Sequence, residues 1–284
     1  MSYPGRQFSQ MSNKPLVSIT IPSYNSEKTI PLCLEAVSKQ SYPSIEILVI
    51  DNHSTDTTRD IASSFGARVI ECDGKLLAAR YLGWKESRGE YIALVDTDQV
   101  LEPTTVERAV ALMDSYDMLV FEEHSYNTEW FIPKLYNASK HIINARFDKF
   151  YAFDPVRGGN PARFFKREIL RKAFARIPQE LISETIHCDH DIIYYESYQV
   201  SPRVSIVRNA VCHIEPNWGK LWRTNYRYGA SLRNIKKSYY WELFLKKRGS
   251  GIWFNRSIRF GLQACLLSLI LKIVQLIGYY FHRL

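Results

Sequence analysis

Four short apolar segments in the first third of the chain alternate with segments whose apolar residues recur at helical spacing. The apolar run at 45–51 (IEILVID) is continuous, which is typical of a strand covered on both faces. Strands and helices that alternate in this way predict a parallel sheet with right-handed crossovers. The predicted strands lie at 16–22, 45–51, 67–71 and 91–96, and the predicted helices lie at 30–37, 55–65 and 76–87.

The second half of the chain is less regular and predicts shorter or interrupted elements. They are a strand at 118–124, a long helix at 129–148 broken near Pro133, a loop at 157–161, a helix at 166–174 and a strand pair within 204–216. The strand pair is expected to close the sheet. We therefore expect an α/β fold in which a Rossmann-like, mostly parallel sheet is flanked by helices.

Residues 258–281 form the most apolar stretch of the chain, interrupted by Lys272. The other polar residues fall on two opposite sides of a helix, so the sequence predicts no clean apolar stripe. A membrane-spanning helix needs about 20 mainly apolar residues, and Lys272 would lie near mid-bilayer, where a charge is costly. We favour a membrane-docked or partly inserted anchor over a full span. A soluble helix packed on the core is the remaining alternative.

The composition fits a globular chain of one large domain, or of one domain with a small appendage. It has 284 residues, of which 46% are hydrophobic and 23% are charged. Its five cysteines lie far apart, so neither a disulfide framework nor a paired-cysteine metal site is indicated. Residues 1–14 lack the apolar core of a signal peptide, and we expect a flexible tail on a protein that stays in the cytosol.

The net charge of +8 is distributed unevenly along the chain. Residues 217–284 hold 13 Lys and Arg against the single acid Glu242, a balance of +12, so the rest of the chain carries −4. Four of the six tryptophans also lie in this segment. Basic residues interleaved with aromatic ones indicate binding to nucleic acid or to a membrane surface. We therefore expect an α/β domain at 15–216 and a basic, helical, membrane-associating region at 217–284.

Three of the predicted strands run into polar residues. The first ends in Pro22-Ser23-Tyr24-Asn25, the second in Asp51-Asn52-His53, and the fourth in Asp96-Thr97-Asp98. Each group alone could be a helix cap or a solvated turn. Open parallel sheets, however, bind ligands at the carboxyl ends of their strands. Three such groups on one edge therefore indicate a binding site.

Asp96 and Asp98 have side chains on the same side of an extended chain, because side chains alternate with a period of two. Two carboxylates without a neighbouring Cys or His suit a hard cation, Mg²⁺ or Mn²⁺, whose shell diphosphate oxygens would complete. The chain lacks GxGxxG and GxxxxGK[ST] motifs. Their absence argues against a dinucleotide dehydrogenase and against a P-loop NTPase.

Two segments carry a specific resemblance to a known family. The chain resembles the family 2 glycosyltransferases of the GT-A fold in VSITIPSYNSEKTIPLCLEAVSKQSYPSIEILVIDNHSTDTT and in AARYLGWKESRGEYIALVDTDQVLEP, within a similarity that covers about 15–216. The resemblance implies a UDP- or GDP-linked sugar donor, a divalent metal and inversion at the anomeric carbon. It places Pro22, Tyr24 and Asn25 along the nucleotide and Asp51 against its base.

The same resemblance assigns Asp96 and Asp98 to the metal and Arg80 to the donor diphosphate. It also implies a third metal ligand or diphosphate contact at His213, which begins an H-x-E-P sequence, and a diphosphate contact at Arg227, which matches the arginine of a QxxRW element. A guanidinium suits phosphate because its planar fork matches the oxygen geometry. A structural histidine at 213 and a surface arginine at 80 are the alternatives.

The catalytic base of the family is the aspartate of a Glu-Asp pair at the start of a helix. The matching segment here is His187-Cys188-Asp189-His190-Asp191, in which Cys188 replaces the glutamate. The resemblance implies that Asp189, or alternatively Asp191, takes the proton from the acceptor hydroxyl. A helix-capping role is the alternative for Asp189.

These observations together predict a metal-dependent inverting glycosyltransferase. We expect it to act at the cytosolic face of the cell membrane, as a peripheral or monotopic protein, on a lipid-linked (polyprenyl-type) or glycan acceptor. The alternatives are a sugar-nucleotide nucleotidyltransferase and a non-catalytic protein that binds nucleic acid or membranes. The first lacks a glycine-rich loop after the first strand, and the second leaves the acidic residues unexplained, so we expect no nucleic-acid partner.

Overall fold

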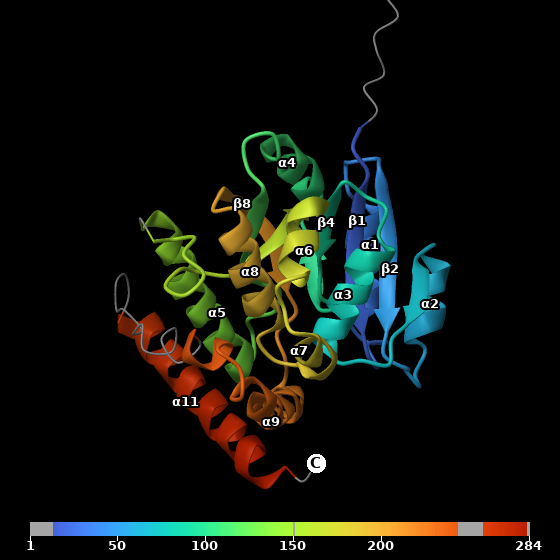
Figure 1. The fold of residues 1–284 in the computed structure, drawn as a ribbon. Helices are drawn as coiled ribbons and strands as arrows, with labels where there is room; N and C mark the ends of the chain where they lie inside the picture. Colours follow the sequence, from blue (N-terminus) through green and yellow to red (C-terminus); the bar gives the residue numbers. More distant parts are fainter. Residues whose placement is uncertain (1–13, 150, 244–257, 283–284) are drawn as a thin grey trace, which may run out of the picture.

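The computed structural model of the chain describes residues 14–149, 151–243 and 258–282 (Figure 1). The expected N-terminal tail at 1–14 lies outside these residues apart from Lys14. Eight strands form one mixed sheet in the order β3-β2-β1-β4-β7-β6-β8-β5. They are β1 (Val17–Ser23), β2 (Ile45–Asp51), β3 (Arg68–Glu71), β4 (Tyr91–Leu94), β5 (Gln99–Leu101), β6 (Met118–Ser125), β7 (Ala162–Lys166) and β8 (Val204–His213).

Helices cover both faces of this sheet. They are α1 (Ile30–Ser38), α2 (Thr58–Ser64), α3 (Leu76–Glu86), α4 (Thr105–Leu112), α5 (Phe131–Asn144) with a 3-10 turn at Ala145–Asp148, α6 (Arg167–Phe174), α7 (Gln179–Glu184), α8 (Asp189–Val200), α9 (Trp218–Ile235) and α11 (Ile258–Phe281). One core cluster packs α1, α2 and α4 against the sheet, and a second joins α3, α6, α7 and α8 to the other face.

The predicted parallel half of the sheet is confirmed. Strand β1 pairs in parallel with β2 and with β4, and β2 pairs in parallel with β3. The alternate residues Val17, Ile19 and Ile21 of β1 are fully buried, as their apolar side chains require. The carboxyl ends of these strands therefore lie together at one edge, the lower edge in Figure 1.

The other half of the sheet differs from the prediction in two strands. Strand β7 lies between β4 and β6 and is antiparallel to both, and β5 is antiparallel to β8. Neither β5 nor β7 was predicted, because three and five residues are too few to show a clear period. The predicted strand pair within 204–216 is wrong: β8 is one strand, whose register shifts where Asn209 adopts a positive φ of 46°.

The predicted break of the helix near Pro133 is also wrong. Helix α5 begins at Phe131, so Pro133 lies in the first helical turn. A proline is tolerated there because the backbone N–H groups of the first turn have no partner within the helix. The helix therefore continues to Asn144 without interruption, and a 3-10 turn completes the predicted segment.

Helix α11 runs along the outside of α5 and α9 (Figure 1). Its Leu267 joins Leu135 of α5 and Leu221 of α9 in a small buried cluster. The backbones of α9 and α11 approach so closely that a Cβ atom at Gly229 would lie 2.7 Å from the carbonyl carbon of Gln275. The two helices therefore meet at glycine, where no side chain holds them apart.

The outward side of α11 carries an apolar stripe, although the charged Arg259 and Lys272 are also exposed on this helix. Six side chains at heptad-like spacing are 41–71% exposed, namely Leu262, Leu266, Leu269, Ile273, Leu276 and Tyr280. The polar Gln275 lies on the inward side, where its Nε2 donates a hydrogen bond to Oδ1 of Asn225 at 3.0 Å. In the described part of the chain, α11 is the helix that is long and apolar enough to cross a membrane.

Candidate active site

The predicted site residues meet at the carboxyl edge of the sheet, and Arg80 of α3 is buried at their centre. Its Nε donates a hydrogen bond to Oδ2 of Asp189 at 3.1 Å, and its Nη2 forms an ion pair with Oδ1 of Asp96. A buried guanidinium is tolerated only when it is paired and hydrogen-bonded, and here the two predicted site carboxylates pair with it. Arg80 thus joins Asp96 to Asp189 and has no exposed side-chain surface, and its contact with a diphosphate stays a prediction.

Two further residues complete this cluster, and neither was singled out from the sequence. Nη1 of Arg163, in β7, donates a hydrogen bond to Oδ2 of Asp96 at 2.9 Å and contacts Nε2 of His190. The same imidazole nitrogen lies 2.6 Å from Nη2 of Arg80. Because guanidinium nitrogens only donate, Nε2 of His190 accepts, and the neutral ring carries its proton on Nδ1.

Burial and the two guanidinium groups together determine the ionisation of Asp96 and His190. Burial alone would raise the pKa of the Asp96 carboxyl, but Arg80 and Arg163 outweigh it and hold this pKa well below its usual range. Burial lowers the pKa of the His190 imidazole, and Arg163 and Arg80 lower it further. Asp96 is therefore ionised and His190 neutral near pH 7.

A short turn directs Asp189 toward this cluster. Cys188 adopts a left-handed conformation with φ of 66° and is the N-cap residue, so Asp189 is the first residue of α8. The capping alternative for Asp189 is therefore wrong. Asp191 lies in the same helical turn and is half-buried. Arg80 pairs with Asp189, and this ion pair fixes the orientation of the carboxylate.

Asp98, the second aspartate of the pair, is in contact with two elements from the end of the chain. Its Oδ2 accepts a hydrogen bond from Nζ of Lys220, in α9, at 3.1 Å, and its Oδ1 lies 3.4 Å from Nε2 of His213. Burial would lower the pKa of the His213 imidazole, but the nearby Asp98 carboxylate raises it overall. Because β5 pairs with β8, strand register places His213 beside Asp98.

The metal-binding prediction can be compared with this donor set. Among the described residues no group of three or more His, Cys, Asp or Glu is arranged to hold a metal ion. Asp98 and His213 nevertheless present a carboxylate oxygen and an imidazole nitrogen, Nε2, side by side, while Nδ1 of His213 lies 3.5 Å from Oε2 of Glu215. Oxygen with imidazole nitrogen is a donor pair that suits Mn²⁺. Both oxygens of Asp96 are already bound by guanidinium groups.

The predicted nucleotide-lining residues lie farther along the same edge, on β1 and β2. Tyr24 is half-exposed, and the guanidinium carbon of Arg227 lies 5.7 Å from the centroid of its ring. Asn25 has a φ of 47°, and its Oδ1 accepts a hydrogen bond from the backbone of Thr55 at 2.8 Å. Pro22 is paired within β1 opposite Ile50 of β2. The loop after β1 and the loop after β2 are thus joined by a hydrogen bond.

Asp51 is fully buried and serves the structure of this loop. Its carboxylate accepts hydrogen bonds from Oγ of Ser23 at 2.8 Å and from the backbone and side chain of Ser54 at 2.8 and 2.6 Å. These bonds leave little free accepting capacity on the carboxylate. The contact of Asp51 with a nucleotide base stays a prediction.

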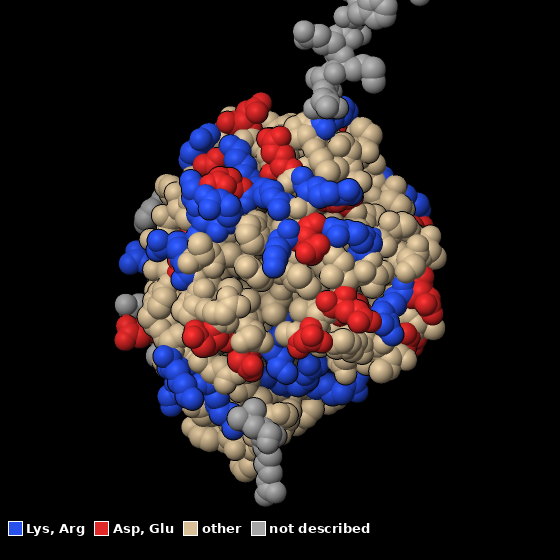
Figure 2. Space-filling view, turned by 45° about the vertical axis from the view of Figure 1, so that its right-hand side comes forward, with Lys and Arg blue, Asp and Glu red and all other residues tan. Residues whose placement is uncertain are grey.

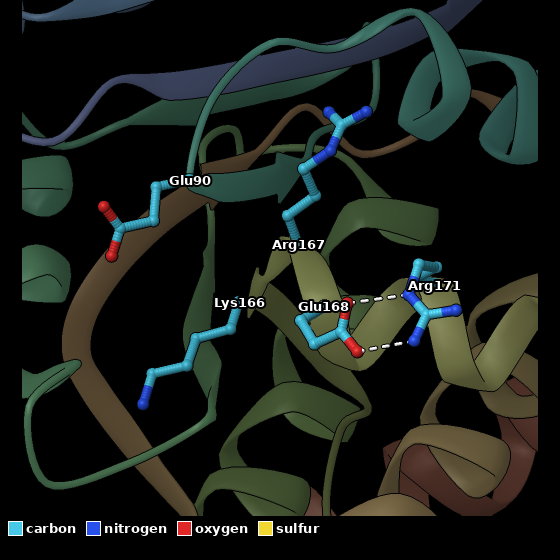
Figure 3. A pocket seen from close by; sticks show the side chains of 5 residues that line it. All are labelled: Glu90, Lys166, Arg167, Glu168 and Arg171. Atoms are coloured by element: carbon cyan, nitrogen blue, oxygen red, sulfur yellow. Dashed lines mark hydrogen bonds and ion pairs between the residues drawn. The ribbon is translucent and has the colours of Figure 1, made fainter.

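A cavity of about 340 Å³ lies away from this cluster (Figure 3). It is lined by Glu90, Lys166, Arg167, Glu168 and Arg171. Glu90 directly precedes β4, so the cavity lies at the amino end of that strand, opposite Asp96. Arg171 donates hydrogen bonds to Glu168 at 2.7 Å, which partly neutralises the lining. The cavity is therefore separate from the carboxyl edge.

Comparison with known sequences gives one family over more than half of the chain. The family model described as Glycosyl transferase family 2 matches residues 18–174. The protein EpsH of Bacillus subtilis is 27% identical over 214 residues, which cover 70% of this chain and 60% of EpsH. The poly(ribitol-phosphate) beta-N-acetylglucosaminyltransferase TarS of Staphylococcus aureus is 24% identical over 204 residues, 67% of this chain and 34% of TarS. The chain thus spans about three fifths of EpsH and a third of TarS.

Solved structures share the fold. The crystal structure of TarS residues 1–349 matches with a TM-score of 0.57 and 20% identity, over 93% of this chain and 80% of that chain. The Mycobacterium tuberculosis glucosyl-3-phosphoglycerate synthase, crystallised with Mn²⁺, UDP and glucosyl-3-phosphoglycerate, matches with a TM-score of 0.53 and 16% identity, over 78% of this chain and 79% of that chain. The family match, the shared fold and the strand-end aspartates agree, and the chain belongs to the family 2 glycosyltransferases.

Proposed function

We propose that this chain transfers a sugar from a UDP-linked donor to an acceptor hydroxyl, with inversion at the anomeric carbon. The observation that carries the proposal is the convergence of Asp96, Asp98 and Asp189 on one sheet edge, from segments up to 93 residues apart. The choice of UDP is supported by two neighbours of the same fold: TarS was crystallised with UDP-GlcNAc, and the glucosyl-3-phosphoglycerate synthase with UDP.

The donor would lie along the loops after β1 and β2. Pro22, Tyr24 and Asn25 would line the nucleotide, and Asp51 would hold the loop that receives the base. Arg227 is exposed above Tyr24, and its guanidinium would bind the diphosphate. Arg80 would act through Asp96 and Asp189, because its own side chain is fully buried.

The metal would be held mainly by Asp98 and His213, whose donor atoms lie side by side. A divalent ion bound there would stabilise the charge that develops on the leaving diphosphate. The bond between Lys220 and Asp98 would have to open for the carboxylate to bind a metal. Asp96 would contribute by holding Arg80 and Arg163 in place at the same edge.

Asp189 would act as the general base that takes the proton from the acceptor hydroxyl. Arg80 donates a hydrogen bond to this carboxylate from the protein side, at 3.1 Å from Oδ2, and so fixes its direction. A base that is held in one orientation is already close to the geometry needed for proton transfer. This orientation raises the rate of the transfer reaction. Asp191 is the alternative base, half a turn farther along α8.

The outward apolar stripe of α11 supports a position on a membrane. A helix that packs on α5 and α9 along one side, and exposes an apolar stripe flanked by the charged Arg259 and Lys272 along the other, fits a helix lying in the membrane interface better than one crossing the bilayer. We therefore propose a monotopic protein at the cytosolic face, acting on a lipid-linked or glycan acceptor. The division at residue 216 into two regions remains part of this proposal.

Thermal unfolding with nucleotides tests the donor and metal assignments together. UDP with Mn²⁺ should raise Tm, since a ligand at a hundredfold excess over its Kd adds about 2.7 kcal/mol to the free energy of unfolding. Asp98→Asn is the matched variant, because it removes one carboxylate at a part-exposed position, and its shifts are measured from its own ligand-free Tm, since it also loses the ion pairs with Lys220 and His213. It should lose the Mn²⁺-dependent part of the shift. Equal shifts with and without Mn²⁺ would contradict the metal, and no shift with any nucleotide would contradict the donor.

A further inference from the structure

Helix α9 touches every part of the candidate site. Lys220 binds Asp98, Arg227 covers Tyr24, and the ring of Tyr228 stacks on that of His187 with centroids 4.5 Å apart. Oγ of Ser231 accepts a hydrogen bond from the backbone of Ile186, in the loop before Asp189, at 3.2 Å. The helix therefore lies across the mouth of the site, although the resemblance assigned a role to Arg227 alone.

The first three turns of α9 expose two kinds of side chain on two different sides. Lys220, Arg223 and Arg227 recur at intervals of three and four residues and so share one side of the helix, which we term the basic ridge. Trp218 and Trp222, 53% and 39% exposed, share another side. By helical periodicity, the second side also carries Gly229, which packs on α11. The tryptophans thus lie toward α11, and the basic ridge lies toward Asp98 and Tyr24.

The basic ridge carries positive charge that no neighbouring carboxylate among the described residues neutralises. Helix α9 contains no acidic residue, and within the described ranges no carboxylate forms an ion pair with Arg223 or Arg227. Figure 2 shows a group of Lys and Arg side chains on the lower part of the molecule, the end at which α9 lies in Figure 1, and further groups on its upper part. An uncompensated pair of guanidinium groups beside a binding edge favours a ligand with phosphate oxygens.

The carboxylates, the basic ridge and the apolar stripe of α11 follow one another in the same order as the hydroxyl, phosphate and lipid chain of one kind of molecule. From the sheet edge outward the chain presents the carboxylates, the basic ridge, the tryptophans and then the apolar stripe of α11. Tryptophan is enriched where membranes meet water, and an apolar stripe suits lipid chains. We infer that the basic ridge at Arg223 binds the phosphate of a lipid-linked acceptor, next to the donor diphosphate at Arg227, with its lipid chain along α11 and its hydroxyl at Asp189. This inference rests on the proposed transferase function and names its acceptor class.

Vesicle binding tests the inference without requiring turnover. Phosphatidylcholine vesicles that contain a polyprenyl diphosphate are compared with vesicles that carry the same charge as phosphatidylglycerol. Wild type should bind the former more tightly. Arg223→Glu should reduce that preference about tenfold or more, the effect of losing one charge-assisted contact. Arg171→Glu is the matched control: it makes the same charge change on an exposed side chain at the opposite edge (Figure 3) and should keep the preference.

Three outcomes overturn the inference: no preference by wild type, equal losses in the two variants, or inorganic pyrophosphate binding in solution as tightly as the lipid. The first two would mean general attraction to anionic membranes, and the third would mean a soluble phosphate ligand. Hydrolysis of UDP-sugar, measured in parallel, should be unchanged in Arg171→Glu, because Arg171 lines the separate cavity at the amino end of β4. If neither wild type nor the variants hydrolyse a donor but the vesicle preference remains, the proposed function is wrong. The phosphate site is still supported in that case.

Discussion

Replacing Gly229 by alanine tests whether α11 stays packed on α9. The new Cβ would lie 2.7 Å from the carbonyl carbon and 2.8 Å from the Cα atom of Gln275, whereas ordinary van der Waals contact begins at about 3.4 Å. The atoms in the way belong to the backbone, so no side-chain rotation can relieve the overlap. The carbonyl oxygen of Gln275 would lie closer still, so the two helices would have to move apart by more than one ångström, which would loosen the bond between Gln275 and Asn225.

The magnitude follows from two opposing effects. Overpacking of a buried contact costs about 1–3 kcal/mol, while replacing glycine by alanine inside a helix stabilises by about 1 kcal/mol. In the packed arrangement we therefore expect a net loss of up to about 2 kcal/mol, which lowers Tm by about 2–4 °C for each kcal/mol in a domain of this size. If α11 left α9 to cross a membrane, the overlap would vanish and the substitution would stabilise the protein.

The sign of the change is thus the result to measure, by thermal unfolding of the full chain in detergent micelles. Gly219→Ala is the matched control in the same helix, since the nearest heavy atoms to its new Cβ lie 3.6 Å away. It should leave Tm unchanged or slightly raised. If Gly229→Ala unfolds at or above the temperature of Gly219→Ala, our description of the α9–α11 packing is refuted.

Three further predictions concern the candidate site and the charges of the core. Asp189→Asn should lower kcat by several orders of magnitude with little change in KM for the donor, and Asp191→Asn should retain activity; the reverse result in a steady-state assay would exchange their roles. Arg80→Met should lower the free energy of unfolding by about 3–5 kcal/mol in denaturant titrations, because it leaves the buried Asp189 carboxylate without its ion-pair partner and Asp96 with Arg163 alone. Burial would raise the pKa of Asp117, but its bonds with Lys166 and Ser201 lower it, so its stabilising effect is complete well above the unfolded pKa of about 3.9 and is lost as pH falls through the folded pKa. Asp117→Asn should accordingly be less stable than wild type at pH 7, with a difference that shrinks below about pH 4; a difference independent of pH would contradict this origin.

The parallel half of the fold could be predicted because its strands are continuous apolar runs joined by periodic helices. The meeting of Asp96 with the loops after β1 and β2 followed from strand direction alone. Strand β7 could not be predicted, since Arg163 interrupts its five residues and faces the site. Its contact with Asp96 depends on β7 inserting antiparallel beside β4, a long-range pairing that leaves no local pattern.

The site as predicted from the sequence included Arg80 without its burial, and it lacked Arg163. Arg80 could be read as a surface arginine on a helix, because nothing in its neighbours along the chain shows that Asp189 closes over it from 109 residues away. The stripe on α11 was missed for a related reason. Polar residues on two sides of a helix obscure the pattern in sequence, and only contact with α5 and α9 shows that Gln275 faces inward.

Strand β8 has a consequence for any fragment of the chain. It pairs with β6 along one side and with β5 along the other, and β5 has no other neighbour in the sheet. A fragment that ended after α6, at residue 174, would leave the backbone of β6 open and β5 unsupported. Such unpaired strand edges recruit other chains, so the fragment should aggregate when expressed even though most of the parallel strands are present. The smallest soluble unit should therefore reach at least His213, the last residue of β8.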